Sequence, residues 1–127
     1  MKILNNKKMI LIYGFDENEK QYVRELLRKL GDIKIKLVEE TMANMKIKDI
    51  IDGLMIKVYD KELPNQQVIL FNNLNDKELE GIVSKIQSSE FISPILAVVT
   101  KISKEWTFKK LVQHLIEEKQ WFKKQKK

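Results

Sequence analysis

Apolar residues along the chain alternate between short continuous runs and longer stretches with helical spacing. The continuous runs predict four strands, at residues 9–13, 33–38, 68–71 and 95–99. The periodic stretches predict four helices, at residues 16–30, 47–54, 79–86 and 106–123, with Gly31 and Gly53 as stop signals for the first two. Because strands and helices alternate throughout, the sequence predicts an α/β domain.

The second half of the chain repeats the plan of the first half. Apolar positions match when the numbering is offset by 58 at the first strand, by 56 at the first helix, and by 61 from the second strand onward. We therefore predict one α/β domain over residues 1–127. It would contain two βαβα pseudo-repeats, at about 9–59 and 68–118, followed by a basic tail at 119–127.

Right-handed crossovers between parallel strands restrict how these elements are arranged. The arrangement with equivalent halves is a four-stranded parallel sheet of order 2-1-3-4, with helices on both faces. The first and fourth helices would then cover one face, and the second and third helices the other. The second strand alternates apolar residues with lysine, which indicates a sheet edge with one side in water.

In a parallel sheet of this order, the carboxyl ends of strands one and three flank a crevice, which is the usual place for a ligand site. Polar and turn-forming residues follow both strands: Gly14, Phe15, Asp16 and Glu17 after the first, and Asn72, Asn73, Asn75 and Asp76 after the third. Their oxygen atoms suit a magnesium or calcium ion, or a small polar ligand. The alternative is that they only cap helices and form tight turns.

The positive charge is concentrated at the end of the chain. The net charge is +6, but residues 119–127 contain five lysines and no acidic residue, so the remainder carries only +1. The tail is interpreted either as a solvated terminus or as a segment that touches nucleic acid or anionic lipid, and nucleic-acid binding is not expected elsewhere. The apolar runs are too short for a membrane span, and no cleavable signal follows the first residues, so we expect a cytoplasmic protein.

The composition argues against most catalytic chemistry. The chain has no cysteine and one histidine, His114, and it contains no glycine-rich phosphate loop. No metal or cofactor is therefore expected, and no serine is placed as a nucleophile beside His114. With Glu117 and Glu118 three and four positions later, His114 fits an exposed ion pair on a helix. The sequence favours a protein without enzymatic activity.

Two large aromatic residues near the end of the chain suggest a contact surface. Trp121 and Phe122 lie among lysines that include Lys123 and Lys124. They either fold back onto the sheet or contact a second subunit. We favour the contact, and with it a homodimer or another protein partner.

The second half of the sequence also carries a family pattern. The segment PILAVVT ends at Thr100 and precedes Trp106, Thr107 and Phe108, with His114 and Leu115 later on the same helix; the segment LIYGF at residues 11–15 belongs to the pattern as well. With these residues the chain resembles a bacterial family known as domain of unknown function 3783. The resemblance implies a compact cytoplasmic protein in which Gly14, Phe15, Thr100, Trp106, Thr107 and His114 are pattern residues, and it implies no activity. Lys109 and Lys110 stand where acidic residues would complete a capping box with Thr107.

Together these observations predict a non-enzymatic protein-interaction or regulatory domain. The alternative is a domain that binds a small ligand or a nucleotide in the crevice.

Overall fold

The computed structural model describes residues 7–28, 33–54 and 63–125, and for 121–125 only the backbone. The described residues form two compact units. The first combines the chain up to Val38 with Asn65–Val99, and the second combines Glu39–Pro64 with the chain from Thr100 onward. The single domain over 1–127 and its repeat boundaries remain predictions, and Leu30 and Gly31 lie outside the described residues.

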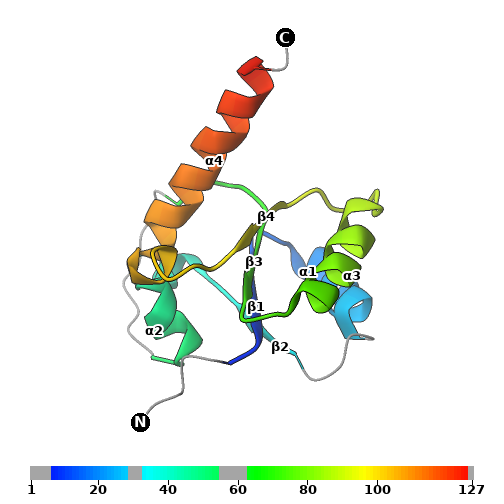
Figure 1. Cartoon of the computed structure of the whole chain (residues 1–127), viewed down its shortest axis with the longest axis horizontal. Helices are drawn as coiled ribbons and strands as arrows, with labels where there is room; N and C mark the ends of the chain where they lie inside the picture. Colours follow the sequence, from blue (N-terminus) through cyan, green and yellow to red (C-terminus); the bar gives the residue numbers. More distant parts are fainter. Residues whose placement is uncertain (1–6, 29–32, 55–62, 126–127) are drawn as a thin grey trace. The chain divides into compact units, whose positions relative to one another are not determined.

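The first unit contains the whole sheet. Its strands are β1 (Met9–Tyr13), β2 (Lys34–Leu37), β3 (Val68–Asn72) and β4 (Ile95–Val98), in the order β2-β1-β3-β4 (Figure 1). The α/β fold, the four strands and their order are as the sequence predicts. All residues of β1 and β3 are buried, in agreement with their continuous apolar runs.

The sheet is mixed, and the prediction of an all-parallel sheet is wrong. β1 pairs in parallel with β2, and β3 pairs in parallel with β4, but β1 and β3 are antiparallel, with Leu11 opposite Leu70. The handedness rule constrains each strand–helix–strand unit separately. The rule does not determine whether β1 and β3 are parallel or antiparallel, because a long connection separates β2 from β3.

The antiparallel centre also changes where the helices lie. With right-handed connections, a parallel centre would place α1 (Glu17–Arg28) and α3 (Asp76–Gln87) on opposite faces, whereas an antiparallel centre places both on the same face. The structure shows the second arrangement (Figure 1). The Tyr22 hydroxyl on α1 lies 2.8 Å from the Ser89 hydroxyl just after α3, and the Tyr22 ring packs edge-on against Phe91. The predicted division of these helices between two faces is therefore wrong.

The core of the first unit lies between the sheet and these two helices. Alternate residues of β1 and β3 face α1 and α3, as expected from the two-residue period of a strand. The buried cluster consists of Ile10, Ile12, Phe15, Val23, Leu27, Ile69, Phe71, Ile82, Ile86 and Ile92.

In the second unit, the segments at the starts of two helices are hydrogen-bonded to each other. α2 (Ile47–Ile51) follows the short 3-10 helix η2 (Glu40–Met42), and α4 (Phe108–Gln125) follows η3 (Ser103–Glu105). The Ile47 N–H donates to the Trp106 carbonyl and the Phe108 N–H donates to the Met45 carbonyl, both at 2.9 Å. These two hydrogen bonds link the segments reciprocally.

The numbering offset that relates the first part of each half is 59 in the structure, whereas the sequence comparison used 58 for the strand and 56 for the helix. Asp16 and Asn75, the N-caps of α1 and α3, are related by an offset of 59 in the numbering, and so are Val23 and Ile82, the most buried residues of these helices. The bounds of β1 and β3 and of α1 and α3 also differ by 59, so the predicted offsets of 58 and 56 do not match the elements. A slip of one position exchanges the faces of a strand, whereas a slip of three moves along a helix by about one turn and keeps nearly the same face. The bounds of β2 and β4 differ by 61, and the internal repeat itself remains a prediction.

Candidate functional site

The residues of the predicted crevice do not come together. Tyr13, the last residue of β1, pairs with Val68, the first residue of β3, while Met9 pairs with Asn72. Gly14, Phe15, Asp16 and Glu17 therefore follow one end of the sheet, and Asn72, Asn73 and Asp76 lie at the opposite end. The crevice required a parallel centre, so the structure does not form it.

Most residues of the first group have local structural partners. The Asp16 carboxylate accepts from the Glu19 N–H at 2.8 Å, and the Glu19 carboxylate accepts from the Asp16 N–H at 2.9 Å, which is a reciprocal capping arrangement. Glu17 forms an ion pair with Lys20 at 3.2 Å. Phe15 belongs to the buried core. These contacts favour the capping interpretation over a ligand site.

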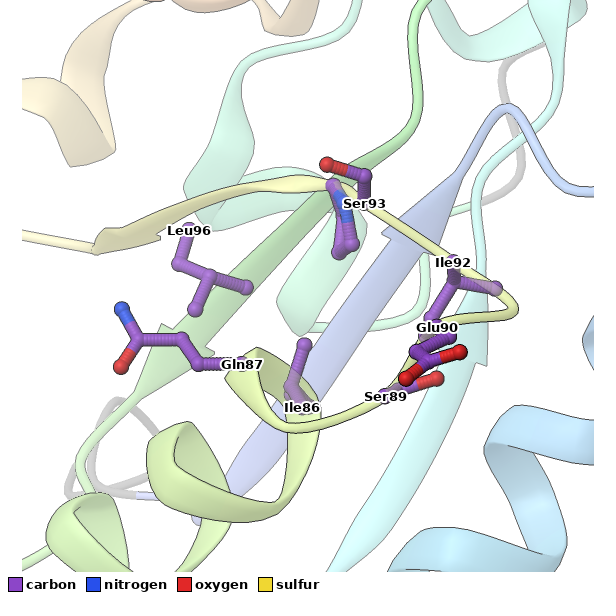
Figure 2. A pocket seen from close by; sticks show the side chains of 8 residues that line it. Ile86, Gln87, Ser89, Glu90, Ile92, Ser93 and Leu96 are labelled. Atoms are coloured by element: carbon purple, nitrogen blue, oxygen red, sulfur yellow. The ribbon is translucent and has the colours of Figure 1, made fainter.

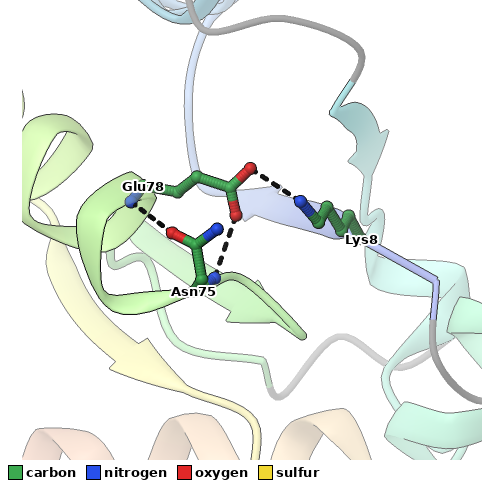
Figure 3. A network of polar contacts seen from close by, with 3 residues as sticks. All are labelled: Lys8, Asn75 and Glu78. Carbon is green, nitrogen blue, oxygen red and sulfur yellow. Dashed lines mark hydrogen bonds and ion pairs between the residues drawn. The ribbon is translucent and has the colours of Figure 1, made fainter.

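The second group shows the same arrangement at the start of α3. Asn75 and Glu78 form a capping box, and the Lys8 ammonium binds the Glu78 carboxylate at 2.8 Å (Figure 3). The hydrogen bond from Lys8, followed by the backbone N–H of Asn75, lowers the pKa of Glu78 below its ordinary value. Asn72 is buried and donates to the Lys7 carbonyl at 2.7 Å. Asp76 is the first residue of α3, where an acidic side chain complements the helix dipole.

Three of the family-pattern residues gather at the start of α4. The Trp106 ring packs edge-on against the His114 ring with centroids 5.3 Å apart, and the Lys110 ammonium lies 4.5 Å from the centroid of Trp106. His114 pairs in turn with Glu118 at 3.4 Å, as its spacing predicts. The Thr107 hydroxyl accepts from the Lys110 N–H at 3.2 Å, so half of the capping arrangement is present although Lys110 cannot supply the other half.

Thr100 has a separate local role in the turn before η3. Its hydroxyl accepts from the Ser103 N–H at 3.0 Å, and the Thr100 N–H donates to the Ser103 hydroxyl at 2.9 Å. Thr100 therefore stabilises the turn between residue 99 and η3.

A surface that the sequence interpretation missed lies along α3 and β4. Apolar side chains dominate a groove here, and Val98 is 51% exposed within it. We call it the apolar groove; it has a volume of about 470 Å³ and is lined by Phe71, Leu79, Glu80, Val83, Gln87, Leu96, Ala97 and Val98. A second depression, shown in Figure 2, shares Gln87 and Leu96 with the apolar groove and is otherwise lined by Ile86 and residues of the loop at Ser89–Pro94.

A corresponding groove lies along α1 and β2, but its lining is charged. We call it the charged groove; its lining residues are Glu17, Lys20, Gln21, Arg24, Glu25 and Leu37. At the helix offset of 59, Lys20 and Arg24 correspond to Leu79 and Val83, and at the strand offset of 61, Leu37 corresponds to Val98. The groove along α1 and β2 is therefore charged, whereas the groove along α3 and β4 is apolar. Matching the two capping pairs in the sequence would have revealed this contrast.

The side chains of Trp121, Phe122, Lys123 and Lys124 lie outside the described residues, so the predicted interaction tail remains a prediction. Among the described side chains, no group of three or more acidic or histidine residues is placed to hold a metal ion. No helix within the described ranges has both the length and the apolar content needed to cross a membrane.

Comparison with protein families gives one match. Residues 67–122 match the model of the family described as Domain of unknown function (DUF3783). This segment contains Thr100, Trp106, Thr107 and His114 and the whole lining of the apolar groove, but not Gly14 or Phe15. The curated proteins and the solved structures gave no significant match. Over residues 67–122 the chain thus resembles the family called Domain of unknown function, which confirms the resemblance seen in the sequence.

Proposed function

We propose that this chain is a non-enzymatic protein-interaction domain and that the apolar groove is its contact surface. The observation that carries the proposal is the contrast between the two grooves. Because Lys20 and Arg24 occupy the corresponding positions on α1, the fold accepts charged side chains there. Leu79 and Val83 pack against the core only in part, and with Leu96 and the exposed Val98 they leave a contiguous apolar surface in water, which is typical of a contact surface.

The two halves of the chain are proposed to be copies of one plan, which makes this contrast meaningful. Support comes from three pairs of corresponding features: the N-caps Asp16 and Asn75, the positive-φ residues Gly14 and Asn73, and the reciprocal bonds between the starts of α2 and α4. The segment that matches the family model is the half that contains the apolar groove.

The alternative, a small-ligand or nucleotide-binding domain, receives less support. Its residues lie at two ends of the sheet and most of them have capping, core or ion-pair roles. The cytoplasmic location and the tail contact through Trp121 and Phe122 are separate predictions.

In-cell photo-cross-linking tests the proposed surface. A photoreactive phenylalanine analogue in place of Val98 should yield covalent adducts with protein. The same analogue in place of Leu37, the corresponding position of the charged groove, is the matched control and should yield few. Equal adduct levels at the two positions would contradict the proposal.

A further inference from the structure

We propose that the occupant of the apolar groove is a second copy of this chain, joined edge to edge through β4. This inference rests on the proposed function and specifies its partner. In the pairing that we propose, the two β4 strands are antiparallel about a two-fold axis beside Ala97. Leu96 of each copy would exchange hydrogen bonds with Val98 of the other.

The backbone of β4 determines which groups are available for such pairing. Among the described strands, β4 pairs only with β3. The Ile95 N–H donates to the Gln67 carbonyl and the Val99 N–H donates to the Phe71 carbonyl, so the odd-numbered residues bond to β3. In a parallel ladder the intervening residues direct their N–H and C=O groups away from that neighbour. These are Leu96 and Val98.

The residues on either side of this short edge fix the register. Pro94 is the preceding outward position, and it has no N–H to donate. Thr100 is the following one, and its N–H already donates to the Ser103 hydroxyl. Along this edge of the described sheet, Leu96 and Val98 remain, and antiparallel pairing that uses both of them in both copies must be centred on Ala97.

The distribution of charge favours a second copy joined in this way. The opposite edge strand, β2, carries Lys34 and Lys36, which are typical protection against edge pairing, whereas β4 (ILAV) carries no charge. Placing β2 of one copy against β4 of another would bring lysines and the charged groove beside apolar side chains. A neutral β4 strand is the complementary partner for β4, and pairing it with itself gives a closed dimer.

The proposed junction would also repeat a geometry that already exists within the chain. β1 and β3 pair antiparallel, with α1 and α3 on the same face and in contact there through Tyr22, Ser89 and Phe91. In the same way, antiparallel β4 strands would place the two α3 helices on one face. Leu96, Val98 and the groove side chains Leu79 and Val83 would then meet across the two-fold axis.

Sedimentation equilibrium of the full chain over a wide concentration range tests this inference. The wild-type mass should rise with concentration from 15.1 kDa toward twice that value. Val98→Lys should remain monomeric. The double variant Leu79→Lys/Val83→Arg, which copies the residues of the charged groove, should also remain monomeric with an unchanged circular dichroism spectrum. Ile102→Lys adds the same charge at an apolar residue that is 71% exposed outside β4, and it should still dimerise.

The outcomes separate this inference from the proposed function. A wild-type chain that is monomeric throughout, while Val98 cross-links to a different protein, would overturn the second-copy inference and leave the interaction function standing. A monomer without Val98 adducts would overturn both. Dimerisation that survives Val98→Lys but is lost in Trp121→Ala/Phe122→Ala would place the contact in the tail and contradict pairing through β4.

Discussion

The residues that directly follow the two central strands have positive φ angles, a backbone conformation that residues other than glycine rarely adopt. Gly14 has φ 89° and Asn73 has φ 61°. A Cβ atom on Gly14 would also clash with the Gln66 carbonyl, which is backbone and cannot easily move. The turn into α1 therefore requires glycine at this position, which makes Gly14 a structural residue rather than a ligand residue.

Substituting Gly14 should consequently be costly. We expect Gly14→Ala to lower the free energy of unfolding by about 2 kcal/mol or more, because left-handed strain and the backbone clash add. Gly81→Ala is the matched control: Gly81 lies within α3, and nothing lies within 4 Å of its added Cβ. The free energy of unfolding of that variant should rise by about 0.5–1 kcal/mol, because alanine has a higher helix propensity than glycine. Urea denaturation measures both, and equal effects would contradict this interpretation of Gly14.

The ion pair between Lys8 and Glu78 makes the stability of the folded chain depend on pH through the ionisation of Glu78. The pKa of Glu78 is lowered in the folded chain, so its stabilising contribution is fully present above the unfolded pKa, about 4.3, and is lost as the pH falls through the folded pKa. Lys8→Ala should raise the pKa of Glu78 toward its ordinary value in an NMR titration. Lys85→Ala, which removes the same charge from the last turn of α3, should leave it unchanged.

At the scale of elements, the two helices of the first unit begin with equivalent reciprocal caps. Asp16→Ala and Asn75→Ala should each lower the free energy of unfolding by about 1 kcal/mol. Because the two caps lie at opposite ends of the sheet, the double variant should show the sum of the single effects. Asn18→Ala, an exposed change within α1, is the control and should have little effect. Thermal or urea unfolding gives the values, and a strongly non-additive double variant would show that the caps are coupled.

The elements themselves were predictable from the sequence, but the direction of the central strands was not. The runs MILIY and VILF are apolar on both faces, so they carry no alternation that would fix register, face or direction. For the same reason an offset of 58 matched as well as 59. The capping pairs held the missing offset, because Asp16–Glu19 and Asn75–Glu78 align only at 59 and match Lys20 and Arg24 with Leu79 and Val83. They carry no information on whether the central strands are parallel or antiparallel.

The predicted crevice failed for this reason too. Its two groups of residues were each correctly placed after a strand, but the assumed parallel centre put them at the same end of the sheet. By contrast, the pair of His114 and Glu118 lies within one helix, where a spacing of four positions is sufficient to bring side chains together. The contact of His114 with Trp106, which precedes α4, was not predicted from the spacing.

At the scale of the whole molecule, the two edge strands of the sheet differ in charge: β2 carries Lys34 and Lys36, whereas β4 carries no charged residue. If the lysines of β2 prevent pairing at that edge, association stops at a dimer joined through β4. Replacing these lysines with apolar residues should then allow pairing at both edges. We expect the variant Lys20→Leu/Arg24→Val/Lys34→Ile/Lys36→Ala, which copies the second half onto the first, to form large open-ended assemblies. Light scattering detects them. A variant that stops at the wild-type mass would contradict the protective role of the lysines.

Residue-resolved hydrogen exchange tests the central claim most directly, because it compares the two edges within one chain. The outward N–H groups of Leu96 and Val98 on β4 correspond to those of Ile35 and Leu37 on β2. At concentrations where the chain is dimeric, Leu96 and Val98 should exchange slowly and lose this protection on dilution, while Ile35 and Leu37 exchange fast throughout. Fast exchange of Leu96 and Val98 at every concentration, as at an open edge, would contradict the account.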